Sequence, residues 1–115
     1  MQFTAKARFI RFSPYKLRPL ADVVRGKNAA YAVNFLSAYP VKRSMPLKKA
    51  IESAIANAKN KSKVSPDMLV IKDIRVDQGP MVKYFKPGAM GRSNVYRKRM
   101  SHIGVILEST EQKEV

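Results

Sequence analysis

The stretch QGPMVKYFKPGAMGRSNVYRKRM, residues 78–100, decides how this chain is organised. It contains six Lys or Arg residues and no acidic residue. A strand-like run, Leu69–Val76, precedes it, and a second one, His102–Leu107, follows it. Loops longer than about 12–15 residues are uncommon inside compact domains, and those that occur are usually functional or disordered. The stretch therefore indicates a partner that carries dense negative charge.

Two interpretations of this stretch are open: a disordered basic arm, or an extended hairpin that continues the strands on either side. Gly79-Pro80 would interrupt pairing at the base, and Pro87–Gly91 is the turn-rich cluster. A tip at that cluster leaves limbs of similar length, Met81–Lys86 and Arg92–Met100, reaching roughly 30 Å. Because an isolated ribbon is marginal in water, we expect a hairpin whose tip is mobile until a partner orders it. Its cations suit phosphates, and Tyr84, Phe85 and Tyr96 suit base stacking.

The whole chain is also strongly basic. Its 115 residues include 23 Lys or Arg against 8 Asp or Glu, a net charge of +15, with an isoelectric point near 10.4. Apolar residues make up 45% of the chain, which is ordinary for a folded protein, and the length is that of one domain. We expect a polyanion, either nucleic acid or an anionic membrane surface, to neutralise this charge.

Several classes of protein are disfavoured. No run approaches the ~18–20 apolar residues of a membrane-spanning helix, and the first residues lack the apolar core of a signal peptide. With no cysteine and one histidine, His102, a zinc site is not expected. We predict no metal, cofactor or small-molecule substrate, and for His102 a hydrogen-bonded place in a strand near RNA. Asp73 and Asp77 are expected to pair with Arg75 and its neighbours rather than to form a carboxylate pair for metal binding or acid–base work.

The rest of the pattern predicts an α+β fold: a small antiparallel three-stranded sheet packed against three helices. Alternation from Phe3 to Phe9 predicts a strand that buries Phe3, Ala5, Ala7 and Phe9. Helices are predicted from Pro14 to about Arg25, with a kink or irregular turn at Pro19, and from Ala29 to about Ser37. A third helix carries an apolar stripe at helical spacing: Leu47, Ala50, Ile51, Ala54, Ile55 and Ala58. We expect one domain, with a globular part at 1–77 and 101–109, the hairpin at 78–100 and a frayed tail at 110–115.

The chain also resembles one family, the bacterial large-subunit ribosomal protein traditionally numbered twenty-two. The resemblance covers about Phe3 to Glu108 and rests on short motifs in a fixed order. These are Ala5-Lys6-Ala7-Arg8, Ser13-Pro14-x-Lys16-x-Arg18, Arg25-Gly26-Lys27, Ser53-Ala54-Ile55-Ala56-Asn57-Ala58, Asp77-x-Gly79-Pro80, Pro87-x-Ala89-x-Gly91-Arg92 and Lys98-Arg99-x-Ser101-His102-Ile103. Each motif is weak alone, but their order and spacing together are specific. Gly88 and Met90 stand where the family usually has basic residues, which makes the predicted tip less cationic. Tyr84 also stands where a basic residue is common.

The resemblance implies a structural, non-enzymatic protein of a bacterial-type ribosome, expected in the cytoplasm, with an organelle ribosome as the open alternative. It would bind large-subunit ribosomal RNA, support assembly, contact neighbouring large-subunit proteins, and line the nascent-peptide exit tunnel with its hairpin, past which the nascent polypeptide moves. The implied RNA contacts are Lys6, Arg8, Arg11, Lys16, Arg18, Arg25 and Lys27 in the globular part, Lys83, Lys86, Gly91, Arg92, Arg97, Lys98 and Arg99 in the hairpin, and His102 at its base. The implied tunnel-lining tip is Pro87, Gly88, Ala89, Met90, Gly91 and Arg92.

Three alternatives compete with this interpretation: a free-standing architectural nucleic-acid module, a small enzyme and a cationic membrane-active protein. The enzyme is disfavoured because no nucleophile and base can be paired from the residues present. The membrane-active protein is disfavoured because Ala, not bulky residues, fills much of the apolar helix faces. The nucleic-acid module stays open at this point.

Overall fold

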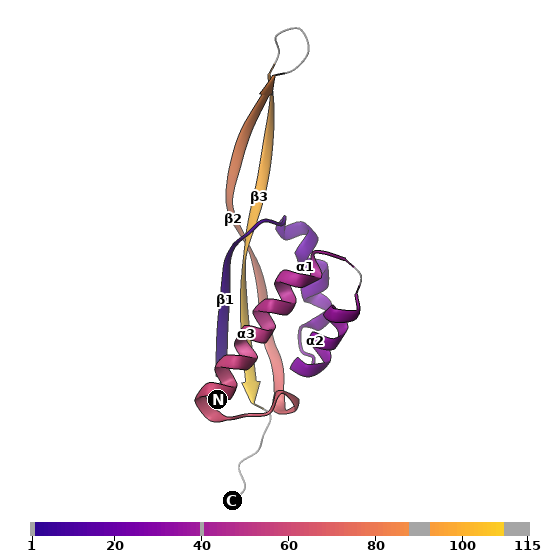
Figure 1. Ribbon diagram of the computed structural model, residues 1–115, viewed down its shortest axis with the longest axis vertical. Coiled ribbons are helices and arrows are strands. Elements are labelled where there is room, and N and C mark those ends of the chain that lie inside the picture. Colours follow the sequence, from indigo (N-terminus) through magenta and orange to yellow (C-terminus); the bar gives the residue numbers. More distant parts are fainter. Residues whose placement is uncertain (1, 40, 88–92, 110–115) are drawn as a thin grey trace, which may run out of the picture.

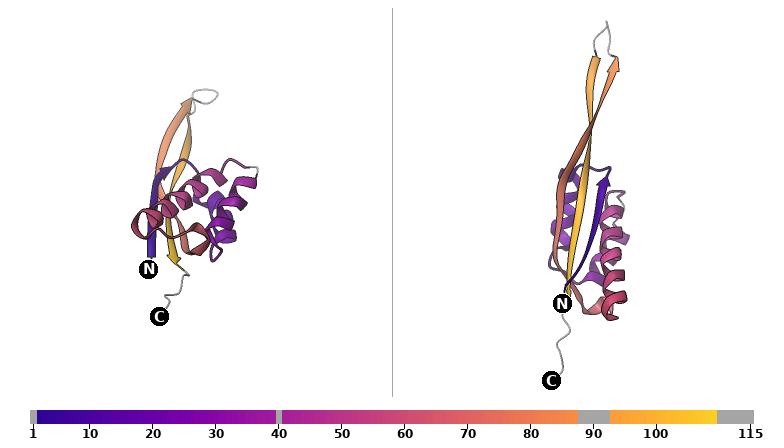
Figure 2. Two further views of the ribbon diagram at one scale, coloured as in Figure 1. Left: turned by 60° about the horizontal axis from the view of Figure 1, so that its bottom comes forward. Right: turned by 90° about the vertical axis from the view of Figure 1, so that its left-hand side faces the viewer.

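A computed structural model describes residues 2–39, 41–87 and 93–109, and the side chains of 82–98 lie outside that description. In chain order the elements are β1 (Gln2–Ile10), α1 (Pro14–Val24), α2 (Ala29–Ala38), α3 (Ser44–Ser62), the short 3-10 helix η1 (Pro66–Met68), β2 (Leu69–Pro87) and β3 (Ser93–Ser109). The strands form one antiparallel sheet in the order β1-β3-β2. The three helices lie on one side of it (Figures 1 and 2). The predicted α+β fold is confirmed.

Helix α1 begins and ends where the sequence predicted. The Ser13 hydroxyl accepts a hydrogen bond from the Tyr15 amide at 3.3 Å, and Pro14 occupies the first helical position. Leu17, Leu20, Ala21 and Val24 are buried, as their spacing predicted. After the helix the chain turns at Gly26, whose φ of +83° disfavours residues with a Cβ. Helix α1 is continuous through Pro19, and the predicted kink stays a prediction.

The other two helices complete the layer against the sheet. Asn28 caps α2 by accepting hydrogen bonds from the amides of Ala30 and Tyr31 at 2.9 and 3.3 Å. Helix α3 buries Leu47, Ala50, Ile51, Ala54 and Ala58, and Ile55 is partly buried against the same core. The small Ala side chains let α3 lie close to its neighbours, and the Asn57 amide donates to the Thr4 carbonyl of β1 at 2.9 Å. These packing contacts confirm the predicted apolar stripe.

One prediction for β1 is wrong. Phe3 and Ala5 are buried against the helices, but the alternation stops at Phe9, which is 59% exposed. The pairing register between β1 and β3 shifts between Ala7 and Ile10. Such a β-bulge inserts an extra residue and reverses the side on which the following residues point. Phe9 therefore lies outside the core, and Ile10 packs against the core in its place.

Strands β2 and β3 stay paired well beyond β1 and the helices (Figure 1). Seven consecutive backbone pairs run from Met81 opposite Arg99 to Pro87 opposite Ser93. The register shifts at the base, between Gln78 and Met81, where Gly79-Pro80 was predicted to interrupt pairing. For these backbone pairs, the structure confirms the extended hairpin and not the disordered arm. The predicted tip at 88–92 and the predicted frayed tail at 110–115 lie outside the described residues.

Candidate nucleic-acid interface

The sheet face opposite the helices carries exposed cations from both edge strands. Lys6 of β1 and Arg75 of β2 pair in register with the same residue of β3, Gly104. Among the residues that the structure describes, no atom lies within 4 Å of the position that a Cβ on Gly104 would take. The two cationic side chains thus flank an open stretch of backbone, and Arg8 is exposed one step further along β1. The predicted basic face of the first strand is confirmed.

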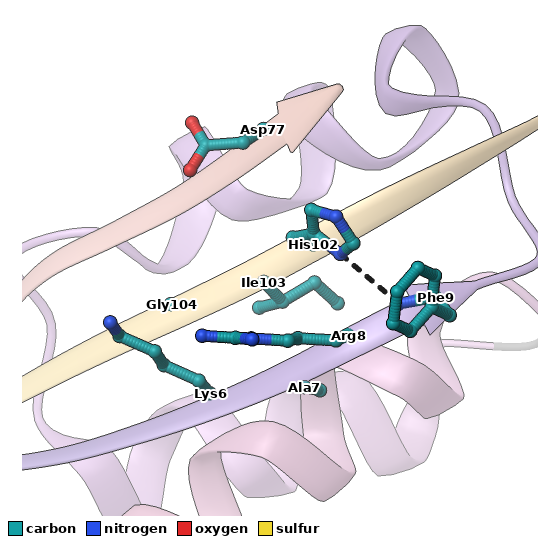
Figure 3. Close-up of a pocket in the computed structure, with 8 residues that line it drawn as sticks. All are labelled: Lys6, Ala7, Arg8, Phe9, Asp77, His102, Ile103 and Gly104. Carbon is teal, nitrogen blue, oxygen red and sulfur yellow. Dashed lines mark hydrogen bonds between the residues drawn. The ribbon is translucent and has the colours of Figure 1, made fainter. Parts of the chain in front are cut away.

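A shallow pocket opens on this face at the end of β1. Its lining residues are Lys6, Ala7, Arg8, Phe9, Asp77, His102, Ile103 and Gly104. Figure 3 shows Lys6 and Arg8 reaching from β1 toward β3, with Asp77 on β2 across from them. The Phe9 amide donates a hydrogen bond to His102 Nδ1 at 3.1 Å. The structure thus confirms a hydrogen-bonded strand position for His102.

A second cluster joins α1 to the base of the hairpin. The guanidinium carbons of Arg18 and Arg99 lie 5.6 and 5.8 Å from the centre of the Tyr15 ring, within cation–π distance. Arg18 Nε also donates to the Val76 carbonyl at 3.2 Å, and Ser101 Oγ donates to the Phe12 carbonyl at 2.6 Å. The fold therefore brings together two predicted RNA contacts that are 81 residues apart in the sequence, since 99 − 18 = 81. We name Tyr15, Arg18 and Arg99 the hairpin-base cluster.

Sequence reasoning missed Tyr15. Its side chain is 63% exposed at the start of α1. The available signal was an aromatic residue interleaved with the cations Lys16 and Arg18 just after a helix cap, a pattern typical of nucleic-acid surfaces. Its position between two arginines, however, depends on contact with β3, which the local sequence does not specify.

Arg25 is engaged within the protein. Its guanidinium pairs with Asp22, donates to the Ile74 carbonyl at 2.6 Å and lies 3.5 Å from an Asp73 carboxylate oxygen. The Asp73 carboxylate also accepts a hydrogen bond from Arg75 Nε at 2.9 Å, and this bond lowers the pKa of that carboxyl. The predicted charge pairing between Asp73 and Arg75 is confirmed. Arg25 ties the end of α1 to β2 and has fewer donors left for a phosphate.

The remaining predicted contacts fall into two groups. Arg11, Lys16 and Lys27 are exposed at the surface of the globular part. The backbone of Lys83, Lys86, Pro87, Arg97 and Lys98 lies in the paired ribbon, and their side chains lie outside the described region. Gly88, Ala89, Met90, Gly91 and Arg92 are outside it altogether.

The described residues, 2–39, 41–87 and 93–109, contain neither a metal-binding cluster nor a membrane-spanning helix. No cluster of three or more His, Cys, Asp or Glu side chains in these ranges could hold a metal ion. No helix in them is long and apolar enough to cross a membrane.

Comparison with known proteins identifies the family. The model of the family "Ribosomal protein L22p/L17e" matches residues 5–108. The large ribosomal subunit protein uL22 of Desulfitobacterium hafniense (strain Y51) is 43% identical over 113 residues, covering 98% of this chain and 97% of that protein. The uL22 protein of Syntrophomonas wolfei subsp. wolfei is 46% identical over 114 residues, covering 98% of this chain and all of that protein. The chain therefore belongs to the ribosomal protein L22p/L17e family, whose members are structural, non-enzymatic components of the large subunit, here of the bacterial cytoplasmic type.

Proposed function

We propose that the protein binds large-subunit ribosomal RNA, supports assembly of the subunit, and lines the nascent-peptide exit tunnel with its hairpin. The paired ribbon of β2 and β3 carries this proposal. It extends past the helices and β1 in a segment that contains six Lys or Arg and no acid. A two-stranded ribbon has no core of its own to cover its faces, so a partner has to supply the covering surface. RNA suits a ribbon of this charge.

The mechanism is electrostatic and geometric. Lys and Arg neutralise phosphates where RNA helices converge, and the ribbon passes between those RNA helices. The globular part, 1–77 and 101–109, supplies a broad basic surface. The segment 78–100 belongs to the same domain and extends away from that surface. At ~3.3 Å per residue the seven paired positions add roughly 23 Å beyond the hairpin base. This reach would let the tip line a tunnel wall beside the nascent polypeptide while the globular part meets RNA and neighbouring ribosomal proteins.

Specific residues are proposed for these contacts. In the globular part they are exposed cations on the open sheet face, in α1 and around the hairpin-base cluster: Lys6, Arg8, Arg11, Lys16, Arg18, Arg25 and Lys27. In the segment 78–100 they are Lys83, Lys86, Gly91, Arg92, Arg97, Lys98 and Arg99, and His102 follows that segment. The proposed tunnel-lining tip is Pro87, Gly88, Ala89, Met90, Gly91 and Arg92.

RNA binding is tested by the salt dependence of affinity for large-subunit ribosomal RNA. If about eight phosphates are neutralised, a slope near −0.7 per contact predicts a loss of roughly three decades between 0.1 and 0.4 M salt. A shortened variant joins Met81 to Arg99 through an Asn-Gly turn, since those two residues are paired in register. It lacks five cations, Lys83, Lys86, Arg92, Arg97 and Lys98, so its slope should be shallower by up to about 3.5. An unchanged slope would show that the removed hairpin cations do not contact RNA phosphates.

The tunnel-lining role is tested separately by cross-linking. The chain has no cysteine, so Gly88→Cys creates a single attachment site for a photoreactive probe at the tip. Ser53→Cys, on the exposed side of α3, is the matched control. In ribosomes carrying a labelled nascent chain, the probe at 88 should cross-link to that chain and the probe at 53 should not. Equal labelling from both positions would overturn the tunnel assignment and leave RNA binding standing.

A further inference from the structure

Phe9 has a conformation and an environment that both work against folding. Its backbone φ is +59°, in the left-handed region that residues with a Cβ rarely adopt. Its side chain is 59% exposed, although an uninterrupted strand would have buried it. Strained residues persist where the surrounding structure imposes them, and they cluster at functional sites. This combination indicates that the Phe9 side chain contacts a binding partner.

The surrounding structure holds Phe9 in this state through His102. The Phe9 amide donates to His102 Nδ1, and the Phe9 and His102 rings meet edge to face with centroids 5.0 Å apart. Because Nδ1 accepts this bond, the neutral imidazole carries its proton on Nε2, which is then available as a donor. The ring contact covers only part of Phe9, as its exposure shows.

The surroundings of Phe9 favour a nucleotide as its partner. Lys6 and Arg8 line the same pocket, and in Figure 3 the Arg8 side chain extends from beside Phe9 along the pocket toward Lys6, which lies at its other end near Gly104. Asp77 is the acidic residue in this lining, and it lies on β2 at the far side of β3. A phosphate is therefore favoured at the β1 side of the pocket and a neutral base near the rings. A purely apolar partner would leave these charges without counterparts.

We propose that Phe9 is a stacking platform for an unpaired RNA base, with Lys6 and Arg8 holding the adjoining phosphate and His102 Nε2–H donating to the same nucleotide. The proposal deepens the RNA-binding function proposed above and rests on it. The β-bulge is the device that creates the platform, because it turns the ring from the helix side of the sheet to the open face. Single-stranded RNA is commonly recognised in this way, by aromatic stacking combined with backbone contacts.

The test separates stacking from charge. Phe9→Gly removes the ring and suits the left-handed backbone, and Phe9→Leu keeps an apolar side chain without an aromatic face. Both should weaken binding to large-subunit ribosomal RNA by about fivefold or more, by the same factor at every salt concentration. Arg8→Ala should instead make the salt slope shallower by about 0.7. The Phe9→Tyr variant, which keeps a stacking ring, should bind as the unaltered protein does.

The matched control is Tyr31→Ala, which removes an aromatic ring of similar exposure, 53%, from α2. It should leave RNA affinity unchanged. Thermal unfolding of each variant is measured alongside, and Phe9→Gly should unfold no earlier than the unaltered protein because it relieves the backbone strain. If Phe9→Leu binds RNA as tightly as the unaltered protein, the stacking proposal is overturned.

Failure of the two proposals can be told apart. If the unaltered protein shows no salt-dependent binding to large-subunit RNA, the proposed function fails. If it binds with the expected slope and the Phe9 variants bind equally well, only the stacking proposal fails. In assembled subunits, a photoreactive phenylalanine analogue at position 9 should cross-link to an unpaired base. Cross-links confined to protein or to paired RNA would overturn the proposal.

Discussion

Substituting the glycine at the base of the hairpin should destabilise the protein, whereas substituting a glycine on the open sheet face should not. A Cβ on Gly79 would lie 3.1 Å from the Met100 carbonyl oxygen, 3.2 Å from its carbonyl carbon and 3.4 Å from His102 Cε1. The two shorter contacts, both with backbone atoms of Met100, are tighter than real Cβ atoms usually make. A Cβ on Gly104 would meet no atom of the described part of the chain within 4 Å.

The expected magnitude follows from two opposing terms. Overpacking of this kind typically costs about 1–3 kcal/mol. Replacing glycine by alanine gains about 0.4–1 kcal/mol by restricting the unfolded chain. Backbone movement at Met100 is limited because the next residue, Ser101, is buried and hydrogen-bonded to Phe12 at 2.6 Å. We therefore expect Gly79→Ala to lower stability by about 1–2 kcal/mol and Gly104→Ala to leave it equal or slightly raised.

Thermal unfolding followed by circular dichroism provides the assay. A chain of this length loses about 4 °C of melting temperature per kcal/mol, so Gly79→Ala should melt roughly 4–8 °C earlier. Gly104→Ala serves as the matched control because it makes the same chemical change on the neighbouring strand. If both variants melt together, close packing between Gly79 and Met100 does not constrain the hairpin base and the reasoning is refuted.

Three further predictions concern other contacts. Asn28→Ala should lower the free energy of unfolding by about 1–2 kcal/mol, because Asn28 caps α2 and its side-chain amide donates to the Asp67 carbonyl at 2.8 Å. Urea unfolding should show a lower midpoint with an unchanged slope. Asp73→Asn should be destabilising at pH 7, because the Arg75 hydrogen bond holds the pKa of Asp73 below its ordinary value of 3.8. That contribution is present above about pH 4 and is lost as the pH falls through the lowered pKa, so a gap between the two proteins that does not narrow as the pH falls below 4 would contradict the assignment. Tyr15→Phe should preserve RNA affinity while Tyr15→Ala lowers it several-fold, because the ring, not the hydroxyl, lies against Arg18 and Arg99. If both variants bind RNA equally tightly in a filter-binding titration, the hairpin-base cluster is not part of the interface.

Local patterns in the sequence predicted most of the fold. The Ser13-Pro14 start of α1, the Asn28 cap of α2 and the Ala-rich stripe of α3 all depend on residues a few positions apart. The hairpin also followed from local features, because two strand-like runs flank a basic segment with one turn-rich cluster. The order of the motifs indicated the family by resemblance, and the comparisons confirmed it, whereas net charge predicted only a polyanionic partner. These properties are readable because periodicity, capping and charge act over short sequence distances.

Only the tertiary structure decided how distant residues meet. The β-bulge at Phe9 depends on pairing with His102, 93 residues away, and alternation alone placed Phe9 on the wrong face. The contact of Arg18 and Arg99 with Tyr15, and the engagement of Arg25 with β2, likewise follow from how α1 docks beside the sheet. By itself the sequence determined which segments are helix, strand or basic ribbon. Strand register, and with it the side chains that line the open face, was decided by hydrogen bonds that close only when the whole sheet assembles.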